Sequence, residues 1–71
     1  MNYTEWAQEY YRDAENVMKT IKKYENILKN SKEPNEENLN SIIASYRYIY
    51  YDILNTAKML DERAKENKNA A

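Results

Sequence analysis

The 71 residues of this chain are enough for one small domain, and they include no glycine, no cysteine, no histidine and a single proline. The missing cysteine and histidine exclude a disulfide framework, a thiolate metal site and the commonest transition-metal ligand and general base. Because the formal net charge is only −1, strong non-specific attraction of the whole molecule to nucleic acid or to an anionic membrane is not expected.

A first helix is predicted from about residue 3 to residue 30. Asn2 is a good N-cap, and the carboxylate of Glu5 can bond back to the cap and favour the positive end of the helix. Apolar positions recur with steps that alternate between four and three residues, the heptad pattern of a helix that packs along a seam on another helix. These seam positions are Tyr3, Ala7, Tyr10, Ala14, Val17, Ile21, Tyr24 and Leu28.

A turn is predicted at about residues 31–34, because Pro34 disfavours helical geometry before it and suits the first turn of a new helix. A second helix is expected from about residue 35 to residue 66, followed by a frayed polar tail at 67–71. It repeats the heptad pattern at Leu39, Ile43, Tyr46, Tyr50, Ile53, Ala57, Leu60 and Ala64. Residues 1–71 are thus expected to form a single helical-hairpin domain.

The two stripes predict that each helix is the other's partner. When they are paired outwards from the turn, Leu28 meets Leu39 and Tyr3 meets Ala64, and the position numbers of every pair add up to the same total. A larger residue meets a smaller one in seven of the eight layers, as a close-packed core requires. We therefore predict an all-α fold, an antiparallel two-helix coiled coil with left-handed wrapping.

Further apolar residues beside the seam predict that the hairpin associates. A seam alone would serve a two-helix coil, whereas a wider apolar face suits a bundle of three or four helices. One flank carries Trp6, Ile27, Ile42 and Ile49, and the other carries Tyr11, Met18 and Leu54. We expect these residues to form the interface of a homodimer, an antiparallel four-helix bundle. Packing against a different helical protein is the alternative.

In length and heptad patterning the chain resembles the Rop family of plasmid RNA-binding proteins, which are also dimers of helical hairpins. A Rop-like RNA binder would use the outer face of the first helix, which carries Arg12, Lys19, Lys22, Lys23 and Lys29. A solvated face supported by pairs such as Glu15 with Lys19 is the simpler interpretation, so nucleic acid is not the expected partner.

Three residues on the outer face of the second helix are candidates for a partner contact: Tyr48, Tyr51 and Met59. A tyrosine on a solvated face offers a large rigid surface with a polar tip, which is typical of interfaces. Five of the other tyrosines occupy seam positions and are expected to be core residues.

No catalytic, cofactor-binding or metal-binding residue is predicted. Glu36 with Glu37, and Asp61 with Glu62, are adjacent in sequence and do not form a facing acid and base pair. No apolar run approaches the ~20 residues of a membrane span, and no small-molecule substrate is evident. We expect a non-enzymatic cytoplasmic interaction module, regulatory or adaptor, with a composition compatible with a phage or mobile-element gene. A structural subunit of a larger helical assembly is a further alternative.

Overall fold

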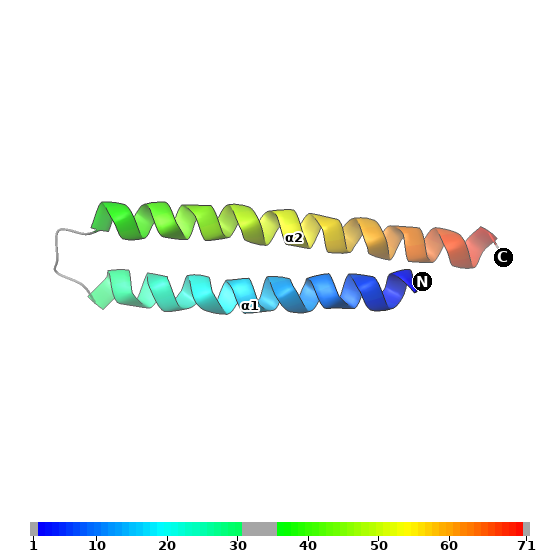
Figure 1. The fold of residues 1–71 in the computed structure, drawn as a ribbon, viewed down its shortest axis with the longest axis horizontal. Helices are drawn as coiled ribbons and strands as arrows, with labels where there is room; N and C mark the ends of the chain where they lie inside the picture. The colour runs from blue at the N-terminus through cyan, green and yellow to red at the C-terminus, as the bar shows by residue number, and fades with distance from the viewer. Residues whose placement is uncertain (1, 31–35, 71) are drawn as a thin grey trace.

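The computed structural model describes residues 2–30 and 36–70, which form two helices. α1 spans Tyr3–Asn30 (28 residues) and α2 spans Glu36–Ala70 (35 residues). The helices run side by side in opposite directions, so the start of α1 and the end of α2 lie at the same end of a rod (Figure 1). The rod measures 58 × 15 × 14 Å. The predicted all-α antiparallel hairpin is confirmed.

α1 begins where its capping residue predicts. The backbone N–H of Thr4 donates a hydrogen bond to the side-chain oxygen of Asn2 at 3.0 Å, and the N–H of Glu5 reaches the same oxygen at 3.5 Å. These bonds satisfy N–H groups that have no partner within the helix. Glu5 in the first turn and Lys29 in the last turn both suit the helix dipole. The expected first helix has the same bounds as α1.

α2 is longer than the sequence predicted. It continues to Ala70, whereas the predicted helix ends near Glu66 and is followed by a frayed tail. No glycine or proline follows Glu66 to stop the helix, and the residues there are compatible with helical geometry. The predicted turn at residues 31–34, the predicted start at residue 35 and Ala71 lie outside the described residues.

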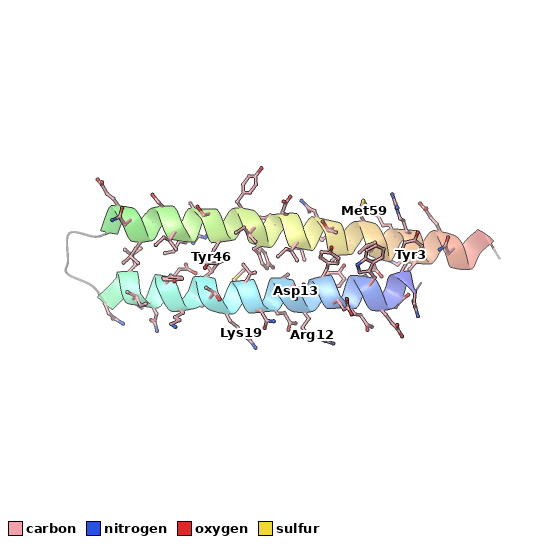
Figure 2. All side chains as sticks on the ribbon, in the orientation of Figure 1. Tyr3, Arg12, Asp13, Lys19, Tyr46 and Met59 are labelled. Carbon is pink, nitrogen blue, oxygen red and sulfur yellow. The ribbon has the colours of Figure 1, made fainter. Side chains whose placement is uncertain are left out.

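The predicted seam forms the core of the hairpin (Figure 2). All sixteen seam residues are buried or half-buried, and none is exposed. The fully buried apolar residues all belong to the seam; they are Ala7, Ala14, Ile21, Ile43, Ala57, Leu60 and Ala64. Among the described residues, no polar or charged side chain is buried. The heptad pattern therefore identifies the packing surface of both helices.

Contacts across the seam agree with the predicted register. The rings of Tyr24 and Tyr46 stack with centroids 5.7 Å apart. Tyr46 is the next seam position after Ile43, the predicted partner of Tyr24, so the ring reaches into the neighbouring layer. Just outside the seam, Arg47 donates a hydrogen bond to the carboxylate of Glu25 at 3.1 Å. The two helices thus meet where the paired stripes place them.

The combined size of the two residues in each seam layer is smaller away from the turn, because each of those layers contains an alanine. The layers near the start of α1 contain the buried alanines Ala7, Ala14, Ala57 and Ala64. The layers near the turn contain the larger Ile21, Tyr24, Ile43 and Tyr46. A methyl side chain lets two helices approach more closely than a ring does. In the view of Figure 1 the ribbons accordingly lie closer together at the N-terminal end than near the turn.

Candidate functional site

The seam leaves two lateral faces of the hairpin uncovered, on opposite sides. The isoleucine face comprises Trp6, Ile27, Ile42 and Ile49, each of which directly precedes a seam residue. The groove face comprises Tyr11, Met18 and Leu54, each of which directly follows one. In an antiparallel pair of heptad helices, residues at the same heptad position flank the seam on the same side. The seven predicted interface residues therefore divide between two faces, and one flat partner can cover only one of them.

The isoleucine face exposes large apolar side chains. Its four residues are between 37% and 45% exposed. The indole of Trp6 stacks on the ring of Tyr3, with ring centroids 6.3 Å apart. Nearer the turn lies a shallow groove of about 450 Å³, lined by Tyr24, Ser41, Ile42, Ser45, Tyr46 and Ile49. None of these lining residues carries a charge.

Two threonines continue the isoleucine face between its apolar residues. Thr20 precedes Ile27 by one heptad, and Thr56 follows Ile49 by one. The hydroxyl of Thr20 donates to the carbonyl of Asn16 at 3.2 Å, and that of Thr56 donates to the carbonyl of Asp52 at 2.9 Å. Both hydroxyl donors are therefore satisfied within their own helix. They would keep these acceptors if a partner buried them.

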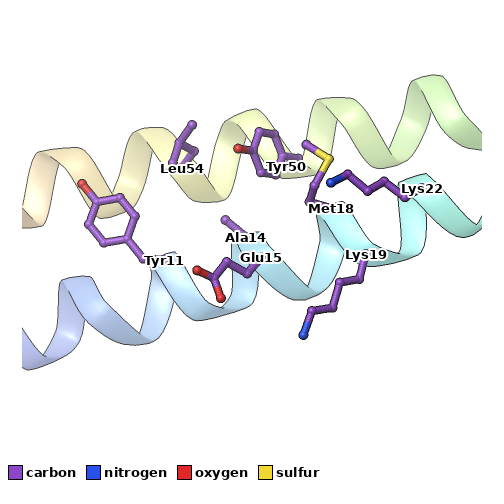
Figure 3. Close-up of a pocket in the computed structure, with 8 residues that line it drawn as sticks. All are labelled: Tyr11, Ala14, Glu15, Met18, Lys19, Lys22, Tyr50 and Leu54. Atoms are coloured by element: carbon purple, nitrogen blue, oxygen red, sulfur yellow. The ribbon is translucent and has the colours of Figure 1, made fainter.

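The groove face has a deeper depression with a mixed lining. Tyr11, Met18 and Leu54 are each half-buried, in contrast to the residues of the isoleucine face. The groove has a volume of about 500 Å³ and is lined by Tyr11, Ala14, Glu15, Met18, Lys19, Lys22, Tyr50 and Leu54. Figure 3 shows Ala14, Met18, Tyr50 and Leu54 between the two helices, with the charged side chains along α1.

The basic residues of α1 differ in their surroundings, because only some of them line the groove. All five predicted members of the basic face, from Arg12 to Lys29, are exposed. Lys19 and Lys22 also line the groove. In Figure 3 the ammonium group of Lys22 extends toward Met18 and Tyr50, while Lys19 projects away from α2. Among the described residues, Arg47 and Glu25 are the pair whose charged nitrogen and oxygen atoms lie within 4.0 Å of each other. The predicted ion pair between Glu15 and Lys19 is therefore not formed.

The outer face of α2 exposes all three candidate contact residues. Tyr48 is 76% exposed and Tyr51 is 60% exposed, and Met59 is exposed as well. The ring of Tyr51 meets that of the groove residue Tyr50 edge-on, with centroids 5.4 Å apart. Tyr51 also precedes Leu54 by three residues, which places it beside the groove. Met59 is two heptads after Ser45, a residue of the isoleucine side, so it does not continue the line of Tyr51.

Over residues 2–30 and 36–70, no three histidine, cysteine or acidic side chains come together in a way that could hold a metal ion. Neither helix has, within that part of the chain, an apolar stretch long enough to cross a lipid bilayer. What the described surface offers is contact area: apolar side chains, tyrosine rings and lysine ammonium groups.

Sequence reasoning missed five residues of the groove, which are Ala14, Glu15, Lys19, Lys22 and Tyr50. Lys22 was assigned to the outer face of α1 and Tyr50 to the seam, yet both line the depression. Lys22 follows Met18 by four residues, and Tyr50 precedes Leu54 by four, so each pair shares one side of its helix. The i, i+4 relation to flank residues was the signal that could have found them.

The fold and these surfaces define the protein as a two-helix antiparallel hairpin with two chemically different lateral faces. Comparison of the chain with protein-family models, with curated proteins and with solved structures finds no match. The resemblance to the Rop family therefore stays one of length and pattern, and function has to be argued from the surfaces themselves.

Proposed function

We propose that this hairpin is a small non-enzymatic protein–protein interaction module, regulatory or adaptor, that works as a homodimer. The observation that carries the proposal is the exposure of Trp6, Ile27, Ile42 and Ile49 on one face. Two copies that pack through their isoleucine faces form the four-helix bundle predicted from the heptad pattern.

Burial of the isoleucine face supplies the driving force. Complete burial of a large apolar side chain is worth about 1.5–3 kcal/mol, so the uncovered part of each of these residues is worth roughly 1 kcal/mol. Each copy contributes four such residues to the shared core. A lone hairpin has no other layer on which to bury them, since only its seam is covered.

The chemistry of the isoleucine face favours a second copy as the partner. A two-fold contact brings the same patch of both copies together, so that patch must be compatible with itself. The groove around Ile42 and Ile49 has no charged lining residue, and like charges therefore do not oppose each other there. Depletion of charge at the centre of a contact is typical of protein interfaces.

Molar mass by light scattering across a dilution series tests the proposal, with helicity followed by circular dichroism at each concentration. We expect about twice the 8.6 kDa of one chain. Ile49→Glu should reduce the mass to that of one chain at the same concentration, because a carboxylate would be buried in the contact. Asn55→Glu adds the same charge to an exposed position of the same helix and should leave the dimer intact.

Two outcomes would contradict the homodimer. A wild-type chain that keeps full helicity as a monomer would show that the isoleucine face needs no cover. A monomer that is only weakly helical at every concentration would mean that this face is completed by a different protein, as in a larger helical assembly.

A further inference from the structure

We propose that the groove face binds an amphipathic helix of a different protein, one that presents an apolar residue next to acidic side chains. The proposal rests on the interaction function proposed above and gives the second face a partner of its own. It follows from the shape of the groove, from its charge and from its connection to the exposed tyrosines of α2.

The shape of the groove suits an inserted side chain. Its floor is formed by Ala14, Met18, Tyr50 and Leu54, and its volume of about 500 Å³ has room for an apolar anchor residue. An amphipathic helix that docks in a groove inserts such anchors from one of its faces. Met18 adds an unbranched, adaptable side chain, which can adjust to the anchor.

The charge of the groove specifies acidic neighbours for that anchor. Lys19 and Lys22 line it from α1, against the single carboxylate of Glu15. Lys58 is exposed and follows Leu54 by four residues, so a further cation flanks the groove from α2, and the carboxylate of Asp61 follows Leu54 by one heptad on the same side. The ammonium group of Lys22 lies over the depression in Figure 3, within reach of a carboxylate beside an inserted residue. Opposite charges across a contact favour the correct partner and speed its association.

The same charges disfavour a second copy of this chain. A two-fold contact through the groove face would place the lysines of one copy's groove against the same basic patch of the other copy, and like charges that face each other are repelled. The groove of the isoleucine face has no charged lining residue. Further along that face, the same heptad position holds Asp13 and Arg63, whose charges are opposite. Nucleic acid fits less well than protein, because Leu54, Met18 and the carboxylate of Glu15 offer nothing to a phosphate.

Exposed aromatic rings extend the contact area beyond the groove. The ring of Tyr51 packs edge-on against that of the groove residue Tyr50, with ring centroids 5.4 Å apart, and Tyr51 is itself 60% exposed. Tyr48 lies one turn before Tyr51 in α2 and is also exposed. Tyrosine is enriched where interfaces derive most of their binding energy. A helix seated in the groove could therefore rest on Tyr51 as well.

The methionines provide a test of where a partner binds. Met18 lines the groove, and Met59 is exposed on a different part of the surface, so methyl-labelled methionine gives a site signal and an internal reference. The probe is a synthetic 15-residue amphipathic helix of leucine and glutamate. A matched peptide with lysine in place of every glutamate is the control. We expect the acidic peptide to shift the Met18 methyl resonance and to leave that of Met59 unchanged.

Two neighbouring lysines provide the matched variants. Lys22→Glu should weaken binding of the acidic peptide at least tenfold, whereas Lys23→Glu, at the next position outside the groove, should change it less than twofold. The proposal is overturned if the acidic peptide leaves Met18 unmoved or if both variants lose affinity equally. It is also overturned if the lysine peptide binds as well, or if a single-stranded RNA 12-mer shifts Met18 and the acidic peptide does not.

Light scattering on the same samples separates this proposal from the homodimer. A dimer that binds no acidic peptide overturns the groove proposal alone. A monomer that binds the peptide at Met18 supports the groove proposal and overturns the homodimer. A monomer that binds nothing overturns both.

Discussion

Ile21 shows how little large apolar volume the hairpin encloses at the level of single residues. It is 1% exposed, and among the described residues it is the largest side chain that is completely buried. Several other buried residues are alanines, and the seam tyrosines are only half-buried. Because few other side chains can compensate for its loss, the hairpin should be unusually sensitive at this position.

Ile21→Ala is expected to lower the free energy of unfolding by about 2–5 kcal/mol, since it removes buried contacts and leaves a cavity. Urea unfolding followed by circular dichroism measures the change. Lys23→Ala in the same helix is the control and should stay within about 0.5 kcal/mol of the parent, because its side chain is exposed. Equal losses from the two variants would show that Ile21 is not a core residue.

Residue-level prediction from sequence succeeded where a local period decides the outcome. Ala14 and Ala57 were predicted to face the other helix, and both are buried. Lys22 illustrates the limit: its Cα position followed from the heptad, but a long flexible side chain can turn toward either neighbouring surface. Its place beside the groove depends on packing with the second helix, which a single helix pattern does not contain.

At the level of elements, register is fixed by the seam and is reported by the ion pair beside it. Arg47 on α2 meets Glu25 on α1 at 3.1 Å, and both side chains are about half exposed. An exposed ion pair is worth little, since water and salt screen the charges and both side chains lose freedom. Its value here is as a marker of which residues lie opposite each other.

A double-mutant cycle on Glu25→Gln and Arg47→Gln should give a coupling energy of about 0.2–1 kcal/mol at low salt. The coupling should decrease as salt is added, because screening weakens the attraction. Thermal unfolding of the four proteins at low and high salt measures both quantities. A coupling of zero at low salt would contradict the expected attraction between the two side chains.

The ends of the elements were less predictable than their faces. α1 starts beside Asn2, whose side chain makes the expected capping bonds, so a local interaction fixed that end. α2 has no comparable stop signal after Glu66 and continues to Ala70. Helix ends that depend on the absence of a breaker are set by small differences in free energy, which sequence patterns do not resolve.

At the level of the whole molecule, the sequence predicts the packing of the seam but not what covers the two lateral faces. The heptad pattern was sufficient for the seam because each helix is the other's partner within one chain. The heptad pattern also placed Ile42 and Leu54 on opposite flanks, but the depression beside Leu54, with its lysine neighbours, became evident only in the hairpin. What covers each face depends on molecules outside the chain, and it therefore stays a proposal.

A homodimer makes stability depend on protein concentration, because dissociation accompanies unfolding. We expect the midpoint of thermal unfolding to fall by roughly 5–10 °C on hundredfold dilution, as mass action on a complex of this size implies. Circular dichroism melts over that range provide the measurement. Ile49→Glu should unfold with a midpoint that does not change with concentration, and a concentration-independent wild-type midpoint would contradict association through the isoleucine face.

The position of Trp6 makes the protein its own optical reporter. It is the single tryptophan of the chain, it lies on the isoleucine face, and it is partly open to water on the lone hairpin. Burial of an indole shifts its fluorescence emission maximum to shorter wavelength. Assembly through this face can therefore be followed by that shift without an attached dye. The groove face has no tryptophan, and a ligand there would leave that emission largely unchanged. A shift of the emission to shorter wavelength therefore reports cover of the isoleucine face and not of the groove face.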